Sequence, residues 1–244
     1  MIRKILKITL TVLISLILLI TVFLLIVSHN PSFYRVVYPG IDDTMTDYPL
    51  TDVSVPADFV TRTAHGINIR APKEHINNPK LPGTGGSTPF KSDTLTVFVQ
   101  SLSEDYKFSS DIKEPFSDKD YEHYFKNLGI EKPDNMIDKI VYIRDKFNAE
   151  CCRNLHLKDL LIFNFEAYGK KTVINMETPY YYHGSNFDGL ICEIPAKRKM
   201  TNVVICNPEL RYHVTITIIC NDTELTNQII AGLDPSPFLA GDVL

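Results

Sequence analysis

An unbroken apolar run near the N-terminus constrains this 244-residue chain more than any other feature. The run extends from Ile8 to Ser28 without a charged residue. About 20 such residues form a helix of roughly 30 Å, which matches the hydrocarbon core of a bilayer. The run ends in Ser28-His29-Asn30-Pro31, without the small residues of a signal-peptide cleavage site. We therefore predict a retained transmembrane signal-anchor helix at residues 8–28. A cleaved signal peptide and a buried helix of a soluble protein are the alternatives.

The distribution of charge predicts the topology of this anchor. Arg3, Lys4 and Lys7 precede the apolar run, whereas only Arg35 follows it closely. By the positive-inside rule, residues 1–7 form a short cytoplasmic segment and the remaining chain lies outside a cell membrane that it crosses once. Three of the 25 basic residues precede the run and all 29 acidic residues follow it, so the exported part has a net charge of −7. This negative charge argues against a nucleic-acid partner.

Beyond the anchor we expect three regions. Residues 29–57 form a linker with several prolines and aspartates, which is either an extended stalk or an arm packed on the domain. Residues 58–233 are long enough for one extracytoplasmic domain with its own core. Residues 234–244 contain two prolines and are expected to be a loose tail.

The periodicity of apolar residues predicts an α+β domain. We expect a hairpin that turns at His65-Gly66, a strand at 93–102, helices at 117–129, 135–147 and 155–169, and a closing helix at 221–233. Gly129 and Gly169 are expected to end their helices. Between the helices and the closing helix we expect an antiparallel meander with strands at 171–177, 179–183, 189–195, 201–207 and 211–220. The glycine-rich segment 83–86 and the acidic segment 103–119 are expected to be surface loops.

The same patterns predict which side chains are buried. In the helix at 155–169 we expect a wide apolar face made of Leu157, Leu160, Leu161, Phe163, Ala167 and Tyr168. In the last strand Ile216 points to the core, and His213 lies on the polar, solvent-facing side. Alternation in the strand at 179–183 would bury Tyr181 and leave Tyr180 and Tyr182 on the opposite face.

The order of these elements resembles that of the PsbP/Mog1-like α/β/α sandwich, which occurs in many membrane-anchored bacterial proteins of unknown role. The stretches that carry the resemblance are "HGINIRAP", "MIDKIVYIRDKF", "LKDLLIFNFEAYGKK", "YYYHGSNFDGLICEI" and "YHVTITIICNDTELTNQIIAGL". They span roughly residues 58–233. The resemblance implies a sandwich with an antiparallel sheet, and it implies no site residue. The chain departs from the common pattern because no aromatic residue follows Gly66 and no Trp follows Pro72.

The sequence contains no strong catalytic motif. It has neither a G-x-S-x-G elbow nor an H-E-x-x-H zinc motif, and we predict no cofactor, no metal site and no catalytic residue. Its five cysteines, Cys151, Cys152, Cys192, Cys206 and Cys220, form no C-x-x-C pair, and spacing does not show which of them are bridged. Cys152 and His156 are four residues apart, so a continuous helix there would allow a Cys-His pair.

The segment "TPYYYHGSNFDG" is the best candidate for recognition, because exposed rings bind partners at a low cost in entropy. We name Tyr180, Tyr182, Phe187 and Asp188 as candidate partner-binding residues. The alternative is that a helix covers these rings.

Three functions remain open. The first is a non-catalytic, membrane-anchored binding or assembly module that meets an unknown protein or envelope partner. The second is an envelope hydrolase or thiol enzyme. The third is a sensory or regulatory ectodomain, which would have to act through a partner because only seven residues precede Ile8.

Overall fold

The computed structural model describes residues 2–50, 53–77, 86–103, 116–176 and 178–241. These residues divide into two compact units, whereas the sequence predicts one domain at 58–233. The helical unit comprises Met1–Asp43, Pro115–Lys132 and Phe147–Lys171, and the sheet unit comprises Thr44–Glu114, Pro133–Lys146 and Thr172–Leu244. Residues 78–85 and 104–115, which include most of the two expected surface loops, lie outside the described residues.

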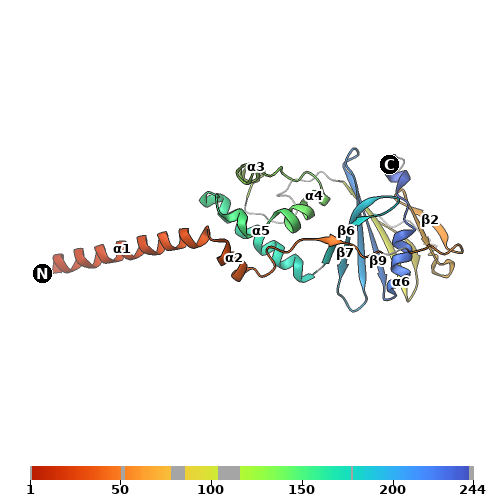
Figure 1. The fold of residues 1–244 in the computed structure, drawn as a ribbon, viewed down its shortest axis with the longest axis horizontal. Coiled ribbons are helices and arrows are strands. Elements are labelled where there is room, and N and C mark those ends of the chain that lie inside the picture. The colour runs from red at the N-terminus through yellow and green to blue at the C-terminus, as the bar shows by residue number, and fades with distance from the viewer. Residues whose placement is uncertain (1, 51–52, 78–85, 104–115, 177, 242–244) are drawn as a thin grey trace. The chain divides into compact units, whose positions relative to one another are not determined.

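The N-terminal apolar run is helical, as predicted. Helix α1 extends over Ile2–Ser28, so it begins before the apolar run and includes its basic flank (Figure 1). The stretch Leu10–Ser28 is apolar enough to cross a membrane, and none of it is buried against the rest of the chain. An apolar helix that finds no protein partner needs another apolar environment. Helix α1 is therefore consistent with a membrane anchor.

The segment at 29–57 is a packed arm, so the extended-stalk interpretation is wrong. Helix α2 (Pro31–Val37) has Asn30 as its N-cap, whose side chain accepts a hydrogen bond from Ser32 N. The ring of Tyr34 is 1% exposed and lies 4.6 Å from the ring of Phe163, both within the helical unit. Met45 is buried in the sheet unit. The aromatic and aliphatic residues of the arm therefore outweigh its prolines and aspartates.

Two further α-helices and a short 3₁₀ helix contribute to the helical unit, which includes helix α5 (Leu157–Met176) as far as Lys171. Helix α3 (Asp118–Leu128) begins with a capping box between Ser117 and Asp120 and ends at Gly129, as predicted, because Gly129 adopts φ 67°. The short 3₁₀ helix, η3 (Ala149–Cys152), precedes α5.

Two expectations about α5 are wrong. The helix passes straight through Gly169, where an added Cβ would meet no atom within 4 Å, so the glycine neither ends nor is required by the helix. The expected strand at 171–177 is the last turn of α5 up to Met176. Leu160, Phe163 and Ala167 are buried as predicted, but Leu157, Leu161 and Tyr168 are exposed.

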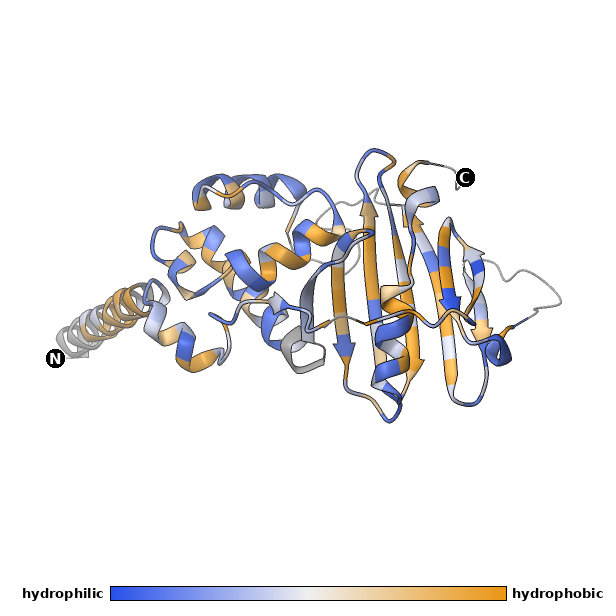
Figure 2. Cartoon of the chain, turned by 45° about the vertical axis from the view of Figure 1, so that its right-hand side comes forward, coloured by the Kyte–Doolittle hydropathy of each residue, from blue (hydrophilic) through white to orange (hydrophobic). Residues whose placement is uncertain are grey.

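The sheet unit contains a seven-stranded sheet in the order β1-β6-β7-β8-β9-β5-β4. Its strands are β1 (Thr46–Asp47), β4 (Ser87–Lys91), β5 (Leu95–Ser103), β6 (Thr178–His183), β7 (Asp188–Ile194), β8 (Met200–Asn207) and β9 (Tyr212–Cys220). Only β1 and β6 are parallel among these neighbours. The predicted strands from residue 179 onward are confirmed, and Figure 2 shows that the central strands are largely hydrophobic. The fold class is mixed α and β.

One face of the sheet carries the main core. The separate hairpin of β2 (Val60–Ala64) and β3 (Ile67–Ala71) turns at His65-Gly66, where both residues have positive φ as this tight turn requires. Helix α6 (Thr223–Ala231) is capped by Asp222, whose side chain accepts a hydrogen bond from Leu225 N over 3.1 Å. The core joins buried side chains of the hairpin, α6 and the sheet, among them Ile67, Ile69, Val203, Ile205, Val214, Ile216, Ile218, Ile229 and Leu233.

The opposite face of the sheet is covered too. Leu190 and Val204 pack there with Ile137 and Ile140 of helix α4 (Met136–Val141), which continues as a π-helical turn over Tyr142–Lys146. His213 lies on the same face as Val204 because their strands pair in register, and it is 5% exposed. The prediction of a solvent-facing His213 is therefore wrong. Alternation of polar and apolar residues indicates a solvent-facing side of a strand only where no other element packs on the polar face.

The C-terminal segment is not a loose tail as far as it is described. Asp234 pairs with Asn68 through two main-chain hydrogen bonds of 2.9 Å. Helix α7 (Ser236–Leu239) follows, and its Phe238 is 1% exposed within the main core. The folded part of the chain therefore extends past Leu233.

Candidate functional site

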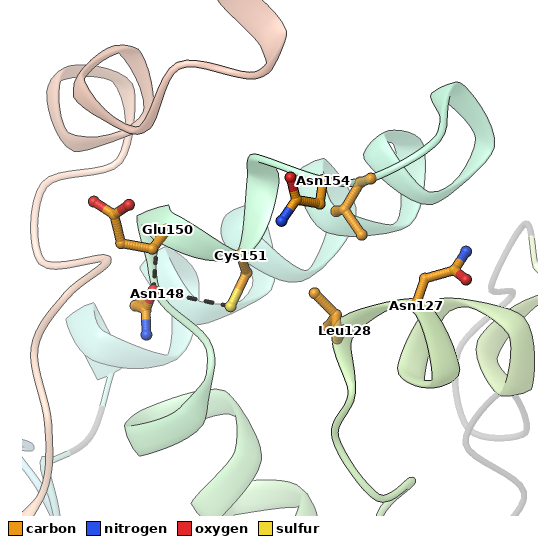
Figure 3. Close-up of a pocket in the computed structure, with 7 residues that line it drawn as sticks. Asn127, Leu128, Asn148, Glu150, Cys151 and Asn154 are labelled. Atoms are coloured by element: carbon orange, nitrogen blue, oxygen red, sulfur yellow. Dashed lines mark hydrogen bonds between the residues drawn. The ribbon is translucent and has the colours of Figure 1, made fainter.

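A polar cavity of about 280 Å³ lies within the helical unit. It is open to solvent between the end of α3, the 3₁₀ helix η3 and the turn that leads into α5 (Figure 3). The residues that line it are Asn127, Leu128, Asn148, Glu150, Cys151, Asn154 and Leu155. The left-handed turn at Gly129 ends α3 and thereby sets Leu128 at the rim.

The side chain of Asn148 organises one wall of the cavity. As the N-cap of η3, its Oδ1 accepts a hydrogen bond from Glu150 N over 2.9 Å. The same oxygen accepts a hydrogen bond from the Cys151 thiol, whose Sγ lies 3.9 Å away. Figure 3 shows both contacts. Burial raises the pKa of the Cys151 thiol. The group is therefore a neutral hydrogen-bond donor at neutral pH rather than a thiolate nucleophile.

The opposite wall is held by a buried carboxylate. Asn127 Nδ2 donates to Asp159 Oδ2 over 2.7 Å, and His123 Nδ1 lies 3.2 Å from the other oxygen of Asp159. Asp159 is 1% exposed. A buried carboxylate that receives hydrogen bonds from α3 ties α3 to α5 and fixes the position of Asn127.

The negative charge of Glu150 is balanced by two arginines. Its Oε1 accepts from Arg35 Nη2 over 2.8 Å, and its other oxygen accepts from Arg153 Nε. Hydrogen bonds from Arg153 and then Arg35 lower the pKa of Glu150. In Figure 3 the carboxylate points away from Leu128. The cavity therefore presents carboxamides, one thiol and two leucines, which suit an uncharged ligand that forms hydrogen bonds.

The residues chosen from the sequence lie elsewhere, in the sheet unit. Tyr182 and Phe187 are 5% and 7% exposed, and their rings lie 4.8 Å apart in the main core. Tyr180 is half-buried against the ring of Tyr48, and only Asp188 is well exposed. The prediction that Tyr182 and Phe187 form an exposed recognition surface is wrong.

The turn of the hairpin explains this outcome. Gly184 N donates to Phe187 O over 3.0 Å, which folds the tip back over the strand. A Cβ on Gly184 would lie only 2.4 Å from the ring of Tyr182, so only glycine permits this approach. Asn186 Nδ2 then donates to Leu233 O over 3.0 Å and holds the tip at the end of α6.

The proposed pairing of Cys152 with His156 is also wrong. Helix η3 ends at Cys152 and α5 begins at Leu157, so no continuous helix places the two side chains on one face. Cys152 is fully buried, and burial raises the pKa of its thiol to about 11. His156 is exposed. None of the five cysteines forms a disulfide, and all five lie in the described residues.

Sequence reasoning missed the residues of the cavity. Asn148 carried a local signal, since an asparagine directly before a helical turn is a typical N-cap. Asn127, Cys151 and Asn154 carried none, because they meet only when α3 packs beside η3 and the turn that follows it. Comparison with known proteins found no matching family model, no similar curated protein and no similar solved structure.

Proposed function

We propose that the protein is a membrane-anchored, extracytoplasmic binding module without catalysis, with the cavity of the helical unit as its binding site. The proposal rests on one contact. Leu155 lines the cavity, and its carbonyl oxygen lies 2.9 Å from Nε2 of His29, the residue that follows the anchor helix. Tyr34 Oη also donates to Ser28 O over 3.1 Å. The first hydrogen bond attaches the cavity directly to the end of the anchor, and the second attaches α2 to the same end.

The ligand class follows from the groups in the cavity. A carboxamide both donates and accepts hydrogen bonds, so the carboxamides of the cavity pair well with sugar hydroxyls or peptide amides. The amide of Asn154 makes no hydrogen bond to any described residue and is available to a ligand. The raised thiol pKa values of Cys151 and Cys152 oppose the alternative of a thiol enzyme.

The fold and topology belong to the same proposal. We propose a PsbP/Mog1-like arrangement for the sheet unit, which is supported by an antiparallel sheet with α6 on one face and α4 on the other. We also propose that residues 1–7 are cytoplasmic and the two units are outside, because Arg3, Lys4 and Lys7 lie on one side of the apolar run.

A second candidate is a sensory or regulatory ectodomain. The contact between His29 and Leu155 favours it, since a ligand that moves Leu155 would also move the residue at the end of α1. A conformational change would then pass to a partner through the membrane helix. Coupling of this kind requires that the ligand prefer one of two arrangements of the turn.

The test measures whether an occupant of the cavity shields Cys151. The full-length chain in its native membrane is labelled with a maleimide in the presence of a neutral oligosaccharide or of an uncharged tripeptide amide. We expect one of these probes to slow labelling at least threefold, and Asn154→Leu to abolish the effect. Ser185→Ala, a change of an exposed residue in the sheet unit, should leave it unchanged. A Cys151→Ser chain gives the background.

Three results would contradict the proposal. If neither probe slows labelling up to its solubility limit, the cavity is not a site for uncharged ligands. If both Asn154→Leu and Ser185→Ala abolish protection, the effect does not arise in the cavity. If the chain is recovered in the soluble fraction, the anchor is not retained.

A further inference from the structure

Helix α5 exposes a stripe of large apolar side chains outside the core. Leu157, Leu161 and Tyr168 are 66%, 56% and 65% exposed. At about 100° per residue, these three positions lie within roughly 40° of one another around the helix. We call them the α5 stripe. The opposite side of α5 buries Leu160 and Phe163 in its own unit. Helix α5 thus has one apolar face that is buried and a second whose large side chains are more than half exposed among the described residues.

The spacing of the α5 stripe is that of a helix that packs on another helix. From Leu157 the stripe advances by four residues to Leu161, by three to Asn164 and by four to Tyr168. Alternating steps of four and three are the a and d positions of a heptad. Asn164 is partly covered, since its Nδ2 donates to Leu160 O over 2.7 Å and to Tyr34 Oη over 3.3 Å within its own unit.

The anchor places the α5 stripe at a defined height. Helix α5 begins two residues after Leu155, whose carbonyl oxygen contacts His29 at the end of α1. Two copies in one membrane therefore present their stripes at the same height and in the same direction. Confinement to a surface also raises the effective concentration of one copy near another. These conditions favour a parallel, in-register contact between identical helices.

The charges beside the α5 stripe do not oppose such a contact. Lys158 Nζ forms an ion pair with Asp120 Oδ1 of its own chain. Lys171 Nζ donates to Val37 O over 3.4 Å and lies 5.9 Å from the centre of the Tyr38 ring. The charge of Lys158 is therefore balanced by a carboxylate, and the Lys171 ammonium is directed towards Val37 and Tyr38 of its own chain, which reduces repulsion between two copies.

We propose that two copies of this chain pair in the membrane through their α5 stripes, packed in parallel. The inference rests on the anchoring in the proposed function and is independent of the ligand. The stripe extends roughly 16 Å along the helix, so a lipid surface could cover all of it only if α5 lay flat. Three side chains fall short of the roughly 800 Å² per partner of a stable interface in solution. Pairing should therefore depend on the membrane.

The test is cross-linking of full-length chains in their native membrane. A symmetric parallel contact places each stripe residue next to its own counterpart. A short bis-maleimide should therefore join Leu161→Cys chains into dimers at least tenfold more efficiently than Glu122→Cys chains, in which an exposed residue of α3 carries the thiol. The unchanged chain gives the background from the native cysteines. Adding Tyr168→Glu to the Leu161→Cys chain should lower dimer formation at least tenfold. Adding Lys126→Glu, a change on α3, to the Leu161→Cys chain should leave dimer formation unchanged.

Each outcome decides the proposal. Equal cross-linking of the Leu161→Cys and Glu122→Cys chains in the membrane fraction would overturn pairing and leave anchoring intact. Recovery of the chain in the soluble fraction would overturn anchoring and pairing together. Quenching of a dye on the Leu161→Cys chain by lipid-borne quenchers, without dimers, would show that lipid covers the stripe. An unchanged melting temperature of the Tyr168→Glu chain is expected, and a large loss would show that Tyr168 belongs to the fold.

Discussion

The imidazole of His29 donates a hydrogen bond to the carbonyl oxygen of Leu155, with 2.9 Å between Nε2 and oxygen. The two residues are 126 positions apart in the sequence. One follows the last residue of the apolar helix, and the other lines the cavity. The side chain of His29 therefore links the end of the anchor directly to a residue of the cavity.

His29→Leu removes this donor. We expect a loss of about 1 kcal/mol of local stability, because Leu155 is buried and its carbonyl loses a partner. Opening of the turn should then expose Cys151, and its maleimide labelling should accelerate about fivefold. His29→Gln, which keeps a donor, is the control and should restore part of the protection. An unchanged labelling rate in the His29→Leu chain would show that the contact does not hold the turn closed.

Tyr182 and Phe187 support the sheet unit rather than a binding surface. Truncation of either ring to alanine should cost about 3–5 kcal/mol, since both lie in the main core. Urea unfolding monitored by circular dichroism measures the loss. His183→Ala, beside them and exposed, should change stability by less than about 0.5 kcal/mol. If the Phe187→Ala chain unfolded at the same urea concentration as the native chain, the ring would lie at the surface.

Acid should weaken the helical unit through Asp120. The ion pair with Lys158 and the hydrogen bonds from Ser117 lower the pKa of Asp120 to about 2, from an ordinary value of 3.8. A carboxyl group with a depressed folded-state pKa stabilises the fold fully above its unfolded pKa and stops doing so as pH falls through the folded pKa. The contribution should therefore be complete above about pH 4 and lost towards pH 2.

Asp120→Asn provides the comparison for this acid effect. The variant should melt below the native chain at pH 7, and the two melting temperatures should converge towards pH 2. Lys158→Met should remove part of the same difference, because it removes the first cause of the depressed pKa. A gap between native and Asp120→Asn chains that stays constant from pH 7 to pH 2 would refute the assignment.

The packed arm predicts the effect of truncation. A chain that begins at Ala57 lacks Tyr34, Ile41 and Met45, all of which are buried. We expect such a chain to lose the ordered helical unit and to aggregate. A chain that begins at His29 keeps these residues and should show a cooperative thermal transition. Equal cooperativity in the two chains would show that the arm contributes little to folding.

Local pattern in the sequence determined much of the architecture. The charge-free run from Ile8 predicted α1, and alternation predicted β5, β9 and the hairpin at His65-Gly66. A helix cap depends on a few neighbouring residues, so Gly129 was a reliable end of α3. These features follow from backbone geometry and from the period of one element. They require no knowledge of what packs on that element.

Only the tertiary structure decided which faces are covered. His213 and Tyr182 lie on faces that α4 and the main core close, whereas Leu157 and Leu161 lie on a face of α5 that the described residues leave exposed. Gly169 lies inside α5, which continues to Met176, so the glycine alone did not mark the end of the helix. The cavity likewise forms where the end of α3 meets η3 and the turn before α5. Periodicity states that a residue is apolar, but burial depends on a second element that is distant in the sequence.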